Sequence, residues 1–452
     1  MALRGTRAGP RHGSRRGDLP RSSRAVTRWG VKSAAAIEQL SPITRRRSRP
    51  LWPIYAAESL ASVGTTLLMA GIFFYTKEKL GWGLPENLLL AAAQGVAYVA
   101  GSLAATRIAG RFGRRRGLIG IFAFLALVPL LPLAWRSPVW LVIALLMYTF
   151  VASLAWPALE SLISSDADVH ALSRRVGIYN LVWSGTNAVT FAAAGIIIAR
   201  WSDGMFILPL AAHALSAVLL WRVRATEAMA ASAACSASMA SEPPHAAPEP
   251  QLLAQRTLAL WLSRIALPAT YVVVYSLMAM MPSLPVIRPL DTATQTIVGC
   301  VWMVARCAAF LYLGATIWWH TRPMVLLSAA AVMLVAFIGV AVRPSDVSGF
   351  STQTIDLWAM IAWQIVLGMV MGIIYAGSLY FGMVLSEGST EHGGYHEALI
   401  GLGSILGPGT AALTQWKWPN DLRAGVVAVS CVIGLSVLAA TLATFRAKRR
   451  RA

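Results

Sequence analysis

Long apolar stretches recur along this chain from Leu51 almost to its end, and they constrain the fold more than any other feature. Each runs for about 18 to 25 residues, which lets a helix cross roughly 30 Å of hydrocarbon. Hydrophobic residues make up 57% of the chain and charged residues only 13%, with a mean hydropathy of +0.60. A soluble core cannot bury that much apolar surface, whereas a bilayer accepts it on the outward face of each helix. We therefore predict an all-α, polytopic membrane protein.

The apolar stretches form two groups of six. The first group is expected near 52–75, 86–108, 117–134, 138–160, 175–199 and 204–222, and the second near 258–285, 292–318, 323–342, 355–384, 395–415 and 424–445. Residues 225–256 lie between the groups, and their Ala, Ser, Pro and Glu content is typical of a flexible linker. The sequence thus predicts twelve transmembrane helices as two six-helix bundles, 51–224 and 257–446, followed by a short basic tail at 447–452.

The formal net charge of +20 would suit a nucleic-acid-binding protein, but the positions of the charges do not. Thirteen of the 39 Lys and Arg residues lie in residues 1–50, and most others cluster in short loops or at the C-terminus. This distribution contains no basic stripe, interleaved with aromatic residues, that could bind along a phosphate backbone. Nucleic acid is therefore excluded as a partner. Residues 1–50 lack the apolar run of a signal peptide and are expected to form a disordered basic tail. This tail is either a lipid-binding arm or the product of a wrongly assigned start codon.

The basic residues of the loops predict the orientation in the bilayer. With twelve spans, and with residues 1–50 left aside, one face carries sixteen Lys and Arg residues and the opposite face eight. In membrane proteins the cytoplasmic loops carry the excess of positive charge. We therefore expect a multi-pass protein of the cell (inner) membrane with both termini in the cytoplasm.

The loop after the second span is a tight basic turn, RIAGRFGRRR, from Arg107 to Arg116. Together with the 6+6 layout it resembles the major facilitator superfamily, whose hallmark in this loop is a Gly, then Asp-Arg, then a Gly followed by paired basic residues. The later part of that motif is matched by Arg111, Gly113, Arg114 and Arg115. Gly110 stands at the family's Asp and Thr106 at its first Gly, so the resemblance does not extend to the cytoplasmic latch that the Asp makes.

Span eleven contains Gly403, Gly407 and Pro408, in a pattern similar to the Gly-xxx-Gly-Pro motif of family antiporters. Those antiporters place the motif in span five, so its antiporter meaning does not transfer to this chain. Glycines four residues apart allow close helix packing, and the proline frees a backbone carbonyl. We therefore expect a closely packed, bendable helix.

Charged residues within the apolar stretches are the strongest candidates for function, because each is costly in hydrocarbon unless it faces a cavity or a partner. Glu58, Arg264 and Arg306 lie at depth in spans one, seven and eight, which line the cavity in the resembling family. We expect them to meet between the halves, with Glu58 as the partner of Arg306 and the best candidate for protonation. Arg306 either takes part in exchanging a proton for a solute or binds an anionic solute directly. A purely structural buried pair is the alternative.

Further candidates come from polar and aromatic residues on the spans expected to line the cavity. They are Tyr148, Trp156, Trp183, Asn187, Tyr271, Tyr275, Gln364 and Tyr375. The stretches that lead into spans five and eleven carry opposite charges, so Arg174 or Arg175 is expected to pair with Glu397 as a cytoplasmic gate. The alternative is that these residues lie on solvated loop ends that never meet.

Motifs for catalysis, nucleotide binding or metal binding are absent from the sequence, and the four cysteines show no ligand spacing. We therefore predict a transporter that is not an enzyme and needs no cofactor. The leading hypothesis is a secondary active transporter that moves a small organic solute across the bilayer by alternating access, with protons as the coupling ion. The alternatives are an uncoupled facilitator and a transporter-like scaffold or sensor without turnover.

Overall fold

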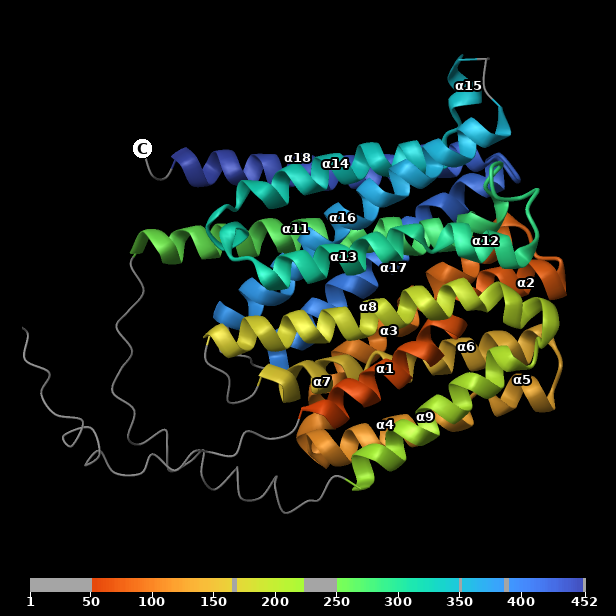
Figure 1. Ribbon diagram of the computed structural model, residues 1–452, viewed down its shortest axis with the longest axis horizontal. Helices are drawn as coiled ribbons and strands as arrows, with labels where there is room; N and C mark the ends of the chain where they lie inside the picture. The colour runs from red at the N-terminus through yellow and green to blue at the C-terminus, as the bar shows by residue number, and fades with distance from the viewer. Residues whose placement is uncertain (1–50, 165–168, 223–249, 349–351, 386–389, 450–452) are drawn as a thin grey trace, which may run out of the picture. The chain divides into compact units, whose positions relative to one another are not determined.

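The computed structural model describes residues 51–164, 169–222, 250–348, 352–385 and 390–449 (Figure 1). All regular elements in these ranges are helical, as predicted. The predicted N-terminal tail and most of the predicted linker lie outside the described residues, and so do residues 450–452 of the basic tail.

The helices before the linker are α1 (Trp52–Thr66), α2 (Ile72–Leu80), α3 (Leu84–Phe112), α4 (Arg114–Leu127), α5 (Leu130–Ala134), α6 (Pro138–Ala152), α7 (Ala155–Ser164), α8 (Val169–Arg200) and α9 (Gly204–Arg222). Those after it are α11 (Pro250–Met280), α12 (Thr292–Gly299), α13 (Val301–Ala315), α14 (Met324–Ala341), α15 (Pro344–Ser348), α16 (Gln353–Leu385), α17 (Thr390–Lys417) and α18 (Leu422–Arg449). Several predicted spans are therefore pairs of helices joined by a short break.

Eleven helical segments of the described chain are long and apolar enough to cross a membrane. They coincide with eleven of the twelve predicted spans. The remaining one, α17, has 28 residues but carries Gly, Thr and Gln residues that lower its hydropathy. We retain α17 as the predicted twelfth span because it packs between α3 and α11, both of which are spans themselves.

Local signals at the helix ends agree with the sequence. Pro138 begins α6 behind Ser137, whose side chain accepts a hydrogen bond from the backbone N–H of Val139 at 3.3 Å. Asp291 caps α12 by accepting hydrogen bonds from the side chain and the backbone of Thr294, at 2.5 and 3.1 Å. The hydrogen bonds from Thr294 lower the pKa of Asp291 below its usual value.

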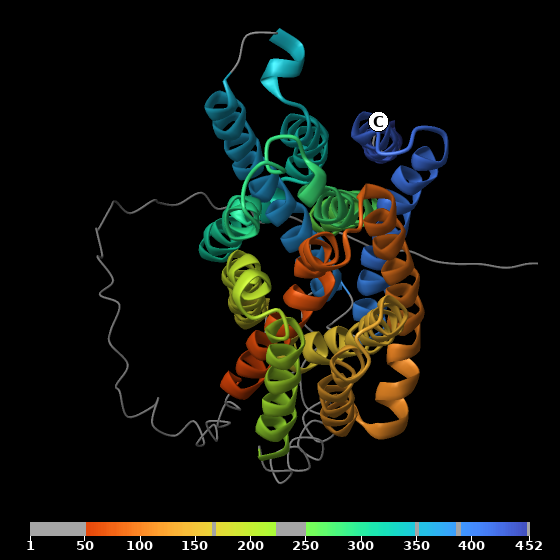
Figure 2. The same ribbon diagram turned by 90° about the vertical axis from the view of Figure 1, so that its right-hand side faces the viewer.

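Three helix pairs make the main contacts between the segments before and after the linker. The most extensive is α3 against α17, followed by α8 against α13 and α8 against α12. Figures 1 and 2 both show α8 beside α12 and α13. Residues from Pro50 onward form one compact unit through these contacts.

Glycines make the contacts of α17 possible. A Cβ atom at Gly403 would collide with the backbone carbonyl of Pro268 and lie 2.8 Å from the Cβ of Tyr271 on α11. On the α3 side, a Cβ at Gly95 would lie 2.6 Å from the backbone of Ser404. The close helix packing expected for the glycines of span eleven is therefore present.

Gly403→Ala is expected to lower the free energy of unfolding by about 1 to 3 kcal/mol, because the new methyl group overpacks the contact between α17 and α11. Thermal unfolding of the purified protein in detergent measures this change. Gly409→Ala is the matched control, since its Cβ would lie 4.0 Å from the nearest described side chain. Equal unfolding midpoints for both variants would contradict a tight glycine contact at Gly403.

Candidate functional site

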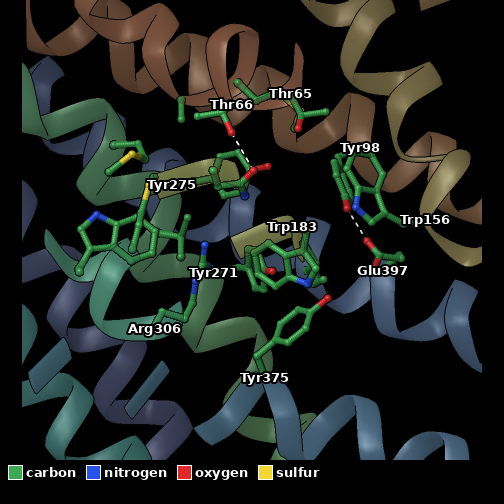
Figure 3. Close-up of a pocket in the computed structure, with 18 residues that line it drawn as sticks. Thr65, Thr66, Tyr98, Trp156, Trp183, Tyr271, Tyr275, Arg306, Tyr375 and Glu397 are labelled. Carbon is green, nitrogen blue, oxygen red and sulfur yellow. Dashed lines mark hydrogen bonds between the residues drawn. The ribbon is translucent and has the colours of Figure 1, made fainter. Parts of the chain in front are cut away.

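A cavity of about 120 Å³ lies between the helices before and after the linker (Figure 3). One wall comes from α1, α3, α7 and α8, and the other from α11, α13, α16 and α17. Both predicted halves therefore contribute to it.

Among the described residues that line this cavity, Arg306 is the only Lys or Arg. Its side chain is 5% exposed, and its guanidinium carbon lies 4.6 Å from the ring centre of Trp183 and 4.8 Å from that of Trp302. Glycines on α16 hold α13 close: a Cβ at Gly368 would collide with the Trp302 carbonyl, and one at Gly372 would lie 2.7 Å from Ala309. Close helix packing thus places a charged side chain between two aromatic faces.

Aromatic rings form the rest of the wall around Arg306. Tyr375 on α16 lies 5.1 Å from Trp183 and 6.5 Å from Tyr271, measured between ring centres. Tyr271 in turn lies 6.3 Å from Tyr275, one turn further along α11. Such offset and tilted arrangements are favourable for aromatic pairs and leave ring faces for a flat or apolar ligand.

The opposite wall is more polar and contains an irregular turn. Thr66 donates a hydrogen bond to the amide oxygen of Asn187 at 2.8 Å. Directly after Thr66, residues Leu67–Gly71 form a single π-helical turn, and Met69 and Ala70 of this turn line the cavity. Wide turns of this kind occur often at functional sites in helices.

A cluster of ionisable residues adjoins the cavity at Glu397. Tyr98 on α3 donates a hydrogen bond to Glu397 on α17 (Figure 3). Ligand atoms of Glu160, His396 and Glu397 lie within 4.8 Å of one another, and all three residues are buried. Ser378 hydrogen-bonds Nδ1 of His396 at 3.1 Å. Glu58 is close enough to interact electrostatically with Glu160 and Glu397. We call Glu58, Glu160 and Glu397, together with the adjacent His396, the carboxylate cluster.

Two acids of the carboxylate cluster are incompletely satisfied. Glu58 accepts a hydrogen bond from Ser62 at 3.3 Å, but its Oε2 atom has no hydrogen-bond partner among the described residues. The same holds for Oε1 of Glu397. Neither acid takes part in an ion pair between described residues. The cluster therefore concentrates acidic groups where little solvent reaches them.

Seven of the eleven residues predicted to bind or couple substrate line the cavity. They are Trp156, Trp183, Asn187, Tyr271, Tyr275, Arg306 and Tyr375. Glu397, the predicted gate residue, lines it as well. These residues, predicted from different spans, therefore share one cavity.

The other four predicted residues do not line the cavity. Tyr148 is buried against α9, where its hydroxyl lies 2.6 Å from Nε2 of His213. Gln364 donates a hydrogen bond to the Val298 carbonyl at 3.2 Å, and half-buried Arg264 lies over the ring of Trp261. Glu58 belongs to the carboxylate cluster.

The expected ion pair between Glu58 and Arg306 is not present. None of the ion pairs between described residues includes Arg306, and Glu58 is instead near other acids. Depth along a span places two residues at a similar level, but the rotation of each helix decides which side chains face each other.

The expected gate between Glu397 and Arg174 or Arg175 is also not formed in this structure. Arg175 donates a hydrogen bond to the Ile163 carbonyl at 3.2 Å within the first half, and Arg174 is exposed. Glu397 is 1% exposed and bonded to Tyr98, so it lies inside the protein rather than at a loop end.

In the basic turn between α3 and α4, Gly113 and Arg115 each have a structural role. Gly113 has φ +76°, a conformation that favours glycine. Arg115 donates hydrogen bonds to the carbonyls of Leu220 and Trp221 at the end of α9, at 2.8 and 2.9 Å. Arg111 is exposed beside the Phe112 ring, and the side chain of Arg114 lies outside the described part of the chain. The turn thus binds the C-terminal end of another helix.

The corresponding turn of the second half, between α13 and α14, has fewer basic and more aromatic residues, and its Arg322 lies over the ring of Trp318. His320 stacks on Tyr380 with ring centres 4.1 Å apart. Burial lowers the pKa of His320 to about 4, with a smaller contribution from Arg256, so this ring is neutral at pH 7.

Sequence reasoning missed Glu160, His396 and Tyr98 as functional candidates. Glu160 was expected at the very end of span four, but α7 continues to Ser164 and keeps the carboxylate buried. His396 lies next to Glu397, at the start of the predicted span 395–415. A signal for Glu160 was present, because it is an acid within the apolar run from Ala155 to Ile163.

Comparison with known families agrees with this architecture. The Major Facilitator Superfamily matches residues 54–408, which is most of the chain. No curated protein matches the chain. The many apolar helices make it a multi-pass membrane protein. The chain therefore belongs to the major facilitator superfamily and is, in general terms, a membrane transporter.

Proposed function

We propose that this protein is a proton-coupled secondary transporter that moves a small organic solute by alternating access. The solute binds in the cavity between the halves, and the carboxylate cluster binds the coupling proton. We also propose that the protein lies in the cell membrane with both termini in the cytoplasm, in accordance with the distribution of Lys and Arg.

The carboxylate cluster is the observation that carries the proposal. Glu58, Glu160 and Glu397 are at most 2% exposed, and electrostatic interactions connect them. Burial makes the ionised form of a carboxylate unfavourable, and neighbouring carboxylates make it more so. Proton binding removes this cost, so the cluster has the chemistry of a proton site that loads and unloads as its access to water changes.

The position of the cluster links proton binding to the motion of the halves. Glu397 belongs to α17, while its hydrogen-bond donor Tyr98 belongs to α3. Glu160 on α7 lies on the same side of the interface as Tyr98, and His396 lies beside Glu397. Separation of α3 from α17 would break the Tyr98–Glu397 bond and expose the acids, so protonation and opening are expected to depend on each other.

The experiment is uptake into proteoliposomes from a mixture of small organic acids, amines, amino acids and sugars, read by mass spectrometry. A pH gradient across the vesicle membrane should drive accumulation of at least one solute, and a protonophore should abolish it. Uptake that stops when the solute concentrations inside and outside the vesicle are equal, and that does not depend on the pH gradient, would identify a facilitator. Binding without flux would identify a scaffold or sensor. Either outcome would overturn the proposed coupling.

A further inference from the structure

We infer that the solute is a small organic anion, an inference that rests on the proposed function. Its carboxylate binds the guanidinium of Arg306, and its apolar or aromatic body packs against the rings of Trp183, Tyr271 and Tyr375. This assignment names the substrate class of the cavity and the residue that selects it.

Arg306 is a buried charge that forms no ion pair with any described residue. Its Nε atom has no hydrogen-bond partner in the part of the chain that the structure describes. No described carboxylate forms an ion pair with it, and Glu397, the acid that lines the same cavity, is bonded to Tyr98. A buried guanidinium in this situation calls for an anion.

The two tryptophans do not replace that anion. Trp183 and Trp302 attract the charge through their ring faces. The N–H donors of a guanidinium, however, lie in its plane and point past its edge. Stacking therefore fixes the orientation of Arg306 while leaving donors for a planar oxyanion, and a carboxylate matches that fork in a bidentate manner.

The lining also limits the charge and size of the anion. A single cationic side chain faces the cavity, together with the acid Glu397, so a monoanion is favoured over a phosphate with two charges. The cavity measures about 120 Å³, similar to the roughly 150 Å³ cavity that accommodates benzene in an engineered protein. One ring or a short chain beside the carboxylate fills such a space.

Benzoate is the probe, and benzamide and benzylamine are its neutral and cationic counterparts of similar shape. Binding of each to the purified full-length protein in detergent is measured by isothermal titration calorimetry. Benzoate is expected to bind at least about tenfold more tightly than benzamide, since only the carboxylate forms a charge-assisted bidentate pair. Benzylamine should bind more weakly still, because it places a cation beside Arg306. Hexanoate serves as an aliphatic second probe.

Arg306→Gln should weaken benzoate binding by about 10- to 100-fold and leave benzamide binding nearly unchanged. Arg306→Lys should recover part of the affinity, because it restores the charge without the planar fork. Arg264→Gln is the matched control: this arginine is on α11 of the same half but does not line the cavity. Size-exclusion profiles and thermal unfolding show whether each variant is folded.

Three results would overturn the inference: equal affinity of the folded wild-type protein for benzoate and benzamide, unchanged benzoate affinity in Arg306→Gln, or no binding of either benzoate or hexanoate. If Arg306→Gln does not fold, the Arg306→Lys variant and the benzoate–benzamide comparison decide. Failure of the proposed function is a separate result. Arg306-dependent benzoate binding without proton-driven uptake would sustain the substrate class and reject the coupling.

Discussion

Glu397→Gln is expected to abolish gradient-driven accumulation of the solute while leaving its exchange across the membrane intact. Glutamine has the shape of the protonated acid and carries no charge, so the variant mimics a permanently loaded proton site. Exchange needs only the loaded state to alternate between the two sides. Net transport needs the proton to leave, and this variant cannot release it.

The measurement compares two assays on the same proteoliposomes. Accumulation driven by a pH gradient should fall to the level of protein-free vesicles, and counterflow of labelled against unlabelled solute should keep most of the wild-type rate. Glu160→Gln is expected to behave similarly, since Glu160 belongs to the same cluster. Glu86→Gln, at an exposed carboxylate on the first turn of α3, is the control and should change neither assay. Undiminished accumulation by Glu397→Gln and Glu160→Gln would exclude both acids as the coupling site.

The fold was largely predictable because its strongest determinant is local. The length of each apolar stretch predicts a spanning helix without reference to the rest of the chain. Breaks within spans were not predicted, and one of them, between α6 and α7 near Ser153, precedes the helix that carries Glu160. Such breaks depend on packing against other helices, which leaves little trace in hydropathy.

The sequence predicted several of the residues that line the cavity, but not which charged residues would be neighbours. Arg306 and the aromatic residues of α8, α11 and α16 line the cavity as expected, because helix identity and depth suffice to place them. Glu58 was matched with the wrong partner. Its neighbours Glu160 and Glu397 come from α7 and α17, and only the rotation and close packing of those helices bring the three acids together.

The glycine contact between α8 and α13 offers a direct way to test the rocking of the halves. A Cβ at Gly177 would lie 3.4 Å from Cα of Gly314, and a Cβ at Gly314 would lie 3.6 Å from Cα of Gly177. Apart from its own stretch of helix, each Cβ has no other described atom within 4 Å. The two backbones are therefore close enough for introduced cysteines to reach the roughly 3.5 to 4.5 Å between Cβ atoms that a disulfide needs.

Gly177→Cys combined with Gly314→Cys is expected to form a disulfide that stops transport almost completely until a reductant is added. The two glycines lie in different halves, near the end of the membrane where the basic loops gather, so alternating access requires them to separate in one state. The background carries serine at the four native cysteines, Cys235, Cys300, Cys307 and Cys431, to prevent other pairings. The double alanine variant at the same glycines should transport normally, which separates the effect of the covalent bond from that of the added methyl groups. Mass spectrometry after alkylation of free thiols measures the cross-linked fraction. Loss of uptake should follow that fraction in proportion, whereas full uptake by completely cross-linked protein would mean that α8 and α13 stay together throughout the cycle.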